Sequence, residues 1–211
     1  MPKRRKEPQY SQASLTRRSF LKGVGMTAAG TTVLSSGLLP HAAGVDSHVV
    51  GPGAVSIAFN VNGITRRVSV EPRMTLAEVL RDQLGMTGTK IICDRGSCSG
   101  CTVWLDGVPV NSCMTFALDA AERKITTIEG LGGVEHLHPL QAAFVDYDGM
   151  QCGYCTPGMV MSCAALLERN PNPTAQDVQQ AISGNICRCG TYPKVIEATL
   201  AAAKSRSRSL S

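Results

Sequence analysis

The stretch Cys93-Asp94-Arg95-Gly96-Ser97-Cys98-Ser99-Gly100-Cys101, followed after eleven further residues by Cys113, decides the fold of the first half of this chain. Its four cysteines have the spacing C-x4-C-x2-C-x11-C. Thiolates bind zinc and iron–sulfur clusters, and four of them in one short region indicate a metal site. Gly96 and Gly100 allow the backbone to turn tightly, so that its N–H groups can converge on the sulfur atoms. The stretch therefore predicts a metal-binding loop.

The segments around this loop predict a mixed domain over residues 53–133. The spacing C-x4-C-x2-C is that of plant-type ferredoxins, which hold a 2Fe–2S cluster. A capping box of Thr75 and Glu78 predicts a helix ending at Leu84-Gly85. Alternating patterns and the turns Asn62-Gly63 and Asp106-Gly107 predict strands at Val55–Val61, Ile64–Val70, Thr102–Leu105 and Val108–Asn111. Strand, strand, helix, metal loop and strand is the order of a β-grasp ferredoxin domain.

A second set of four cysteines has the spacing C-x2-C-x31-C-x1-C and consists of Cys152, Cys155, Cys187 and Cys189. Its surroundings predict four helices within residues 134–204, and the whole chain is thus of the α+β class. The helices are expected at Pro139–Tyr147, from Thr156 as cap and Pro157 to Arg169, from Thr174 with Asp177 to Gly184, and from Pro193 to about Lys204. Cysteine hairpins at helix ends would bring four thiolates together at one pole of a bundle.

Zinc and disulfides are the alternatives for these cysteines. Paired C-x2-C units also make structural zinc sites, and a zinc site is a fair alternative for the second set alone. Disulfides fit badly, because nine cysteines are an odd number and a C-x1-C pair is strained as a bridge. The four histidines lack metal-ligand spacing and are interpreted as surface or capping residues: His41, His48, His136 and His138.

Three further residues near the cysteines are candidates for a role. Cys163 falls on one apolar helix face with Met159, Val160, Leu166 and Leu167, which predicts a buried core thiol and no ligand. Trp104 is interpreted as core. Arg188 lies between two ligands and either offsets the charge of the second cluster or binds a carboxylate outside it.

The first 52 residues predict an export signal and a linker. Thr16-Arg17-Arg18-Ser19-Phe20-Leu21-Lys22 resembles the twin-arginine pattern, and a modest apolar run follows to Leu39. A basic helix or a membrane anchor is the alternative, but several glycines dilute the apolar run and disfavour a span. Export of the folded protein to the periplasm is therefore expected, with no stable membrane anchor.

Charge and composition exclude other classes of function. Residues 1–43 carry seven Lys/Arg and one acid, whereas residues 44–211 carry fourteen Lys/Arg and fifteen acids. The formal net charge of +5 thus comes from the signal, and the scarcity of aromatics (4%) also argues against nucleic acid as a partner. Residues 205–211 are interpreted as a basic, Ser-rich tail.

Together, these motifs resemble the iron–sulfur part of the xanthine oxidase, or molybdenum hydroxylase, family over residues 53–204. The resemblance is closest to the small subunit of bacterial periplasmic aldehyde oxidoreductases. Besides the Cys93–Cys101 loop it rests on Asn111-Ser112-Cys113, Gln151-Cys152-Gly153-Tyr154-Cys155-Thr156-Pro157-Gly158-Met159 and Asn185-Ile186-Cys187-Arg188-Cys189-Gly190-Thr191-Tyr192. It implies a β-grasp 2Fe–2S ferredoxin domain followed by a four-helix 2Fe–2S-binding domain.

The resemblance also implies an assembly. A large subunit would carry molybdopterin and oxidise aldehydes to carboxylic acids, with Gln151 and Cys189 of this chain near the pterin. A medium subunit would carry FAD, and this chain would relay electrons from the second cluster through the first. A chain of 211 residues has no room for either partner's cofactor domain, so no catalytic residue is expected here. The alternatives are a free-standing two-cluster ferredoxin and a zinc-stapled, non-redox binding module.

Overall fold

The structure, a computed structural model, describes residues 51–133 and 135–209. The twin-arginine segment, nearly all of the predicted linker, and His41 and His48 lie outside these ranges, and the expectations about them stay predictions. Over the ranges described, none of the helices combines the length and the apolar character needed to cross a bilayer.

Two hairpins form most of the sheet in the first half of the chain. The turn at Asn62-Gly63 takes left-handed φ angles of 52° and 80°, and the turn at Asp106-Gly107 takes 51° and 81°. Asn and Gly tolerate this conformation better than other residues, which explains why the hairpins form where the sequence predicts them. The strands are β1 (Val55–Val61), β2 (Ile64–Val70), β3 (Thr102–Leu105) and β4 (Val108–Asn111), as predicted.

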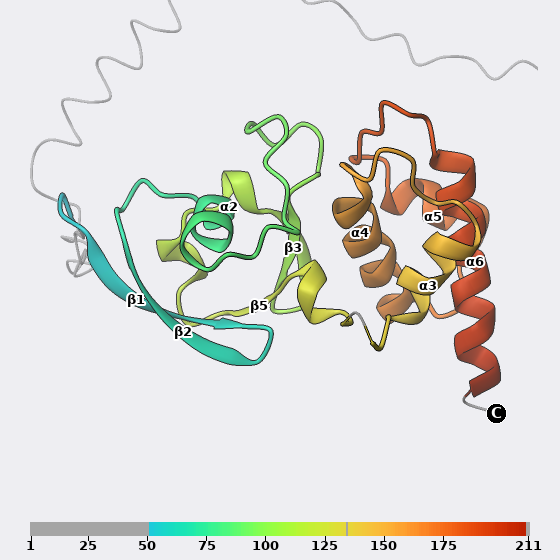
Figure 1. Ribbon diagram of the computed structural model, residues 1–211, viewed down its shortest axis with the longest axis horizontal. Helices are drawn as coiled ribbons and strands as arrows, with labels where there is room; N and C mark the ends of the chain where they lie inside the picture. Colours follow the sequence, from blue (N-terminus) through green and yellow to red (C-terminus); the bar gives the residue numbers. More distant parts are fainter. Residues whose placement is uncertain (1–50, 134, 210–211) are drawn as a thin grey trace, which may run out of the picture. The chain divides into compact units, whose positions relative to one another are not determined.

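A fifth strand, β5 (Lys124–Thr126), joins the two hairpins and was not predicted. It pairs in parallel with β1 and antiparallel with β3, which gives the strand order β2-β1-β5-β3-β4 (Figure 1). Three residues are too few to show an alternating pattern, so only the partners on both sides define this strand.

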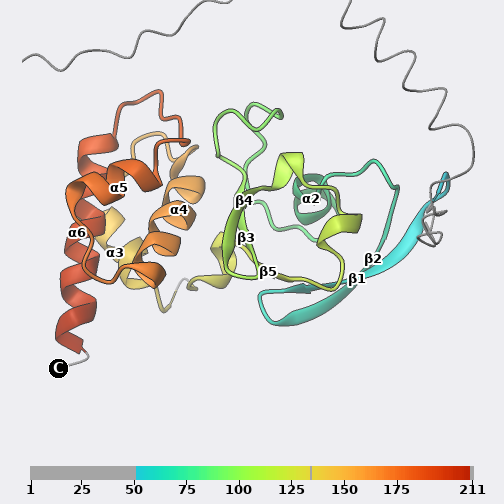
Figure 2. The ribbon, with the colours of Figure 1, turned by 180° about the vertical axis from the view of Figure 1, so that it is seen from behind.

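The helix of the first half begins at the predicted capping box. The Thr75 hydroxyl accepts from the backbone N–H of Glu78 (3.3 Å), and the Glu78 carboxylate accepts from the Thr75 N–H (2.7 Å). Helix α2 (Leu76–Glu78) continues as a π-helical turn over Val79–Gln83. Buried Leu76 and Leu80 pack with Phe59 of the sheet into one core, and α2 lies beside the sheet in both ribbon views (Figure 2). This arrangement is the predicted β-grasp.

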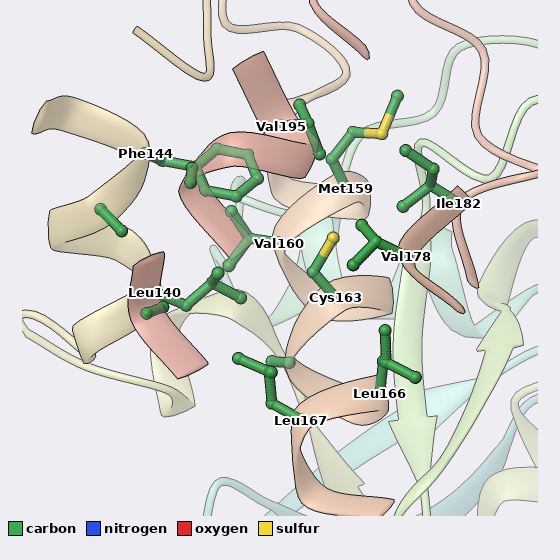
Figure 3. Close-up of a cluster of buried hydrophobic side chains, with 14 of the residues drawn as sticks. Leu140, Phe144, Met159, Val160, Cys163, Leu166, Leu167, Val178, Ile182 and Val195 are labelled. Atoms are coloured by element: carbon green, nitrogen blue, oxygen red, sulfur yellow. The ribbon is translucent and has the colours of Figure 1, made fainter. Parts of the chain in front are cut away.

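The second half is the predicted four-helix domain. Its helices are α3 (Pro139–Asp146), α4 (Thr156–Arg169), α5 (Ala175–Ala181) and α6 (Tyr192–Ser209). The side chains of Phe144, Met159, Val178 and Val195 come together from all four helices into one buried cluster (Figure 3). Cys163 lies in its middle, fully buried, which confirms its interpretation as core.

Two helix ends differ from the prediction. Cys155, and not Thr156, is the N-cap of α4. The Thr156 N–H closes a turn onto the carbonyl oxygen of Gly153 (3.3 Å), just before the helix begins. Thr156 is therefore the first helical residue. Helix α5 ends at Ala181, before the turn that contains Gly184.

Helix α6 runs on to Ser209, through most of the predicted 205–211 tail. Two contacts hold this extension: the Ser205 hydroxyl donates to the carbonyl of Ala202 (2.9 Å), and Arg206 pairs with Glu168 (3.1 Å). Basic residues near a helix C-terminus also interact favourably with the helix dipole. The sequence pattern missed the extension because its apolar face ends earlier.

Trp104 joins the two domains and is not simply a core residue of the sheet. Its side chain is half-buried, packs against the core of the helical domain, and donates from Nε1 to the carbonyl oxygen of Met161 in α4 (3.0 Å). Ile128 and Leu131 pack against the same core. The β-grasp domain and the helical domain thus share an apolar contact that the sequence did not reveal.

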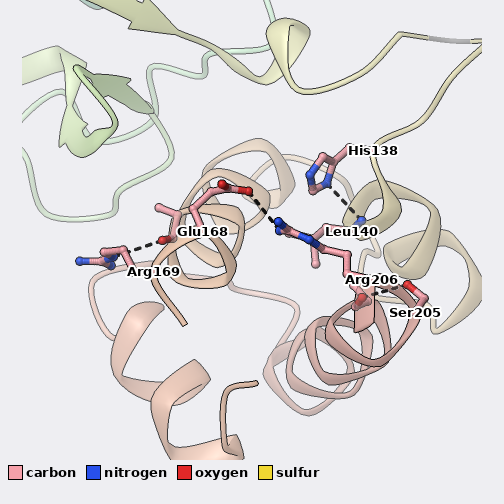
Figure 4. Close-up of polar contacts among 8 residues, drawn as sticks. His138, Leu140, Glu168, Arg169, Ser205 and Arg206 are labelled. Atoms are coloured by element: carbon pink, nitrogen blue, oxygen red, sulfur yellow. Dashed lines mark hydrogen bonds and ion pairs between the residues drawn. The ribbon is translucent and has the colours of Figure 1, made fainter. Parts of the chain in front are cut away.

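His138 caps helix α3, as its interpretation as a capping residue predicted. Its Nδ1 accepts from the backbone N–H of Leu140 (3.2 Å), and the Gln141 side chain accepts from the His138 N–H (2.9 Å). The imidazole lies near the Arg206–Glu168 ion pair (Figure 4). Burial lowers the pKa of His138, the charge of Arg206 lowers it further, and Glu168 acts in the opposite direction.

We expect the helical domain to lose stability as the pH falls through the ordinary histidine pKa of about 6.5. Because the pKa of folded His138 is below that value, the unfolded chain takes up the proton first. A protonated Nδ1 also cannot accept the Leu140 N–H. Thermal unfolding of the full chain at pH 5.5 and 7.5 measures the loss. His138→Asn keeps a capping acceptor without a titrating ring, and an equal loss in that variant would contradict the role of His138.

Candidate metal centres

The first ligand set lies in the loop between α2 and β3 and in the short 3-10 turn after β4. Three of its thiols are buried and one is half-buried: Cys98, Cys101 and Cys113, and Cys93. The thiols interact in two pairs, Cys93 with Cys98 and Cys101 with Cys113. The structure thus brings together all four residues that the spacing predicted.

Two side-chain hydrogen bonds to backbone carbonyl groups hold this loop in place. The Asn111 side chain donates to the carbonyl oxygen of Gly96 (3.1 Å), and the buried Ser112 hydroxyl donates to that of Cys101 (2.7 Å). Gly96 has a left-handed φ of 70°, as expected for a tight turn. Gly100 acts differently, since a side chain there would overlap Ile92.

Backbone N–H groups of the loop point at sulfur. The N–H of Arg95 donates to Cys93 and is the main reason that the pKa of this thiol is lowered to about 7. Burial raises the pKa of Cys98, and it raises that of Cys113 to about 11. In the Cys93–Cys98 pair, one thiol therefore ionises readily while its partner keeps a proton to donate. A metal ion that displaces this proton finds thiolates already supported by N–H donors.

The second ligand set lies at the start of α4 and in the turns before α6. Cys187 is buried, Cys155 is half-buried, and Cys152 and Cys189 are exposed. The sulfur atoms again meet in two pairs, Cys155 with Cys187 and Cys152 with Cys189. The helix ends bring the four thiols to one place, as predicted.

In each pair of this set, one thiol has a lowered pKa and its partner a raised pKa. Burial raises the pKa of Cys155 to about 12, and the Cys187 sulfur adds to the shift. Burial acts on Cys187 in the same direction, but hydrogen bonds from the side chain and backbone of Thr191 outweigh it and lower its pKa to about 7. The backbone N–H of Tyr154 lowers the pKa of Cys152. Both sets therefore place N–H donors where sulfur carries charge.

The two-and-two arrangement fits a 2Fe–2S cluster in each set. Each iron of such a cluster takes two of the four protein thiolates, whereas a zinc ion needs its ligands around one point. A 2Fe–2S cluster in either set would accept and release one electron at a time.

Comparison with known proteins agrees with this geometry. Residues 59–127 match the family model of the 2Fe-2S iron-sulfur cluster binding domain, and residues 127–200 match that of the 2Fe-2S binding domain. The aldehyde oxidoreductase iron-sulfur-binding subunit PaoA of Escherichia coli O157:H7 is 40% identical over 200 residues, which cover 88% of this chain and 86% of PaoA. This chain belongs to the iron–sulfur subunits of the molybdenum hydroxylase family.

Two further proteins similar to this chain are named for different substrates. The nicotine 6-hydroxylase small subunit of Paenarthrobacter nicotinovorans is 46% identical over 146 residues, 69% of this chain and 88% of its own length. The crystal structure of quinoline 2-oxidoreductase from Pseudomonas putida 86 contains a chain with 42% identity and a TM-score of 0.70. The match covers 74% of this chain and 97% of that one. The fold is therefore shared among proteins named for an aldehyde, nicotine and quinoline.

The residues singled out beside the ligands lie on the surface of the subunit. Gln151 is exposed directly before Cys152, and Cys189 is an exposed ligand. Arg188 is exposed too, and within the described ranges none of the ion pairs includes it. The carboxylate contact considered for Arg188 is thus not seen among these residues.

The junction between the two ligand sets was missed by the sequence analysis. The backbone N–H of Ile186 donates to the carbonyl oxygen of Cys98 (3.1 Å), and the Asn185 side chain donates to that of Ser99 (3.2 Å). A side chain at Gly158 would overlap the Ser99 carbonyl oxygen and lie 3.0 Å from the Gly100 Cα. A glycine in the first turn of α4, where it weakens a helix, was the available signal for such a close approach.

We expect Cys163→Ala to keep four irons per chain, because Cys163 is fully buried in the helical core and its thiol interacts with Thr199 and with no thiol of either ligand set. Loss of the sulfur leaves a small cavity, and the free energy of unfolding should fall by about 1 kcal/mol. Iron analysis together with denaturant unfolding measures both effects. Two irons in this variant would make Cys163 a ligand and break the assignment above.

Proposed function

We propose that this chain is the electron-transfer subunit of a multisubunit molybdenum oxidoreductase. The observation that carries the proposal is the direct contact between two four-thiol sets, through the bond from Ile186 N–H to the carbonyl of Cys98. Two centres that exchange electrons must be close and rigidly placed, and here the ligand loops themselves touch. A zinc-stapled binding module has no need of this contact.

The exposed side of the second set supports a docking role toward a large molybdopterin subunit. Cys152 and Cys189 are open to solvent, with Gln151 beside them and two large, exposed side chains in the same loops, Tyr154 (54%) and Ile186 (55%). An amide and a cluster thiolate both form hydrogen bonds to a pterin edge. Exposed apolar side chains around them suit a protein partner.

The exit side of the relay is proposed to be the first set. Met114 and Phe116 follow Cys113 and are 62% and 52% exposed, so this loop also offers an apolar surface. A medium subunit with FAD docking here would make the assembly a heterotrimer, and electrons would pass from this chain to the flavin. The order is molybdenum, second set, first set, flavin.

Aldehydes are the proposed substrate class. The support is the 40% identity to PaoA, which extends over 88% of the chain and thus beyond the two cluster domains. The substrate would be bound and oxidised on the large subunit. This chain would take part by removing electrons from that site.

Purification of the native complex through a tag on this chain tests the assignment, with molybdenum, iron and flavin measured together. We expect all three in one complex, whereas a lone two-cluster monomer would favour the free-standing ferredoxin. Cys155→Ala should abolish magnetic interaction between molybdenum and the iron–sulfur signals and stop flavin reduction by substrate. Cys98→Ala should keep that interaction and block only flavin reduction. Cys163→Ala is the matched control, and the reverse pattern for the two ligand variants would invert the relay.

The periplasm is the proposed workplace, on the strength of the Arg17-Arg18 motif. We expect Arg17→Lys with Arg18→Lys to leave this chain in the cytoplasm, together with any partner that has no signal of its own. Cell fractionation with an aldehyde oxidation assay measures the distribution. Arg4→Lys with Arg5→Lys removes two arginines outside the motif and serves as the control. Normal periplasmic activity in the first variant would refute the assigned route.

A further inference from the structure

A three-residue segment, Asn185-Ile186-Cys187, connects the two ligand sets, and it is called the bridging segment here. Each of its members has a different contact. Cys187 is a ligand of the second set, Ile186 N–H donates to the carbonyl of Cys98 (3.1 Å), and the Asn185 side chain donates to the carbonyl of Ser99 (3.2 Å). The segment therefore needs a fixed conformation if the two sets are to stay in contact.

The hydroxyl of Tyr192 forms hydrogen bonds with the backbone at both ends of this segment. It accepts from the backbone N–H of Cys187 (2.8 Å) and donates to the carbonyl oxygen of Asn185 (3.1 Å). One hydroxyl thus satisfies the two backbone groups that flank Ile186. Because Asn185 and Cys187 are buried (4% and 7% exposed), few water molecules could replace it.

Tyr192 is well anchored for such a role. It is the first residue of α6, and its half-buried ring packs against the core of the helical domain. The preceding residue, Thr191, places its hydroxyl 3.3 Å from the Cys187 sulfur. Two consecutive side chains therefore hold the sulfur and the backbone of one ligand.

The first ligand loop leaves the bridging segment little room to shift. Ser99 has a left-handed φ of 51°, and its carbonyl oxygen lies against both Gly158 and the Asn185 side chain. A displacement of the bridging segment would therefore break the bonds to Cys98 and Ser99 and could not be followed by the loop.

We propose that Tyr192 is a positioning residue, whose hydroxyl holds the bridging segment so that Ile186 stays bonded to the first ligand loop. The hydroxyl of Tyr192 acts through the backbone of Asn185 and Cys187, with which both of its hydrogen bonds are formed. The proposal rests on the proposed electron-transfer function, because its purpose is to keep the two clusters in contact. It assigns a role to a residue outside both ligand sets.

Tyr192→Phe in the full chain tests the proposal, because it removes the hydroxyl and keeps the ring. Hydrogen exchange of peptides that cover residues 184–189, followed by mass spectrometry, should become about fivefold faster, since one net hydrogen bond contributes about that factor to an equilibrium. Iron should stay at four per chain. Rapid-freeze EPR after a sub-stoichiometric radiolytic pulse should show slower redistribution of the single electron between the two clusters.

Tyr147→Phe is the matched control, because it removes an exposed hydroxyl at the end of helix α3, outside the bridging segment and both ligand sets, and should change neither measurement. Asn185→Ala tests the same segment from its other end and should accelerate exchange while Tyr192 is intact. Unchanged hydrogen exchange in Tyr192→Phe would overturn the proposal. Loss of two irons in this variant would overturn it as well, because the hydroxyl would then be needed for binding a cluster. If the wild-type chain showed no electron redistribution, the proposed function would fail while the exchange result still decided the role of Tyr192.

Discussion

Sulfur atoms that carry negative charge close to one another need positive charge nearby, and in both ligand sets backbone N–H groups supply it. The N–H of Arg95 serves Cys93, that of Tyr154 serves Cys152, and that of Thr191 serves Cys187. Such groups converge only where the chain turns sharply, and Asp94, Gly96, Ser99, Gly153 and Gly190 all have left-handed φ angles. The sheet and the helices hold the loop ends in place so that these turns persist.

Features that depend on neighbouring residues could be predicted from the sequence. Both hairpins form at their Asn-Gly and Asp-Gly turns, and the capping boxes of Thr75 and Thr174 begin their helices where predicted. The cysteine spacings predicted eight ligands, and the structure pairs their thiols within each of the two sets. Each of these signals is carried by at most a few residues, so tertiary contacts had little scope to override them.

Features that depend on distant residues could not be predicted. Strand β5 forms because β1 and β3 pair with it on its two sides. The Trp104 side chain donates to a carbonyl oxygen in α4 that is 57 residues away along the chain. Asn185 and Ser99 are 86 residues apart along the chain, and no pattern in either segment predicts the hydrogen bond between them. The pairing of thiols within each set belongs to this group too, because spacing alone does not say which sulfur atoms meet.

The absence of a side chain at Gly158 has a consequence for how such proteins diversify. Helix α4 lies against the Ser99 carbonyl so closely that only hydrogen fits between them, and Trp104 and Asn185 bond across the same junction. Neither half could be exchanged for an unrelated cluster domain without rebuilding both surfaces. The two cluster domains therefore form a single structural unit, whose halves cannot be replaced one at a time.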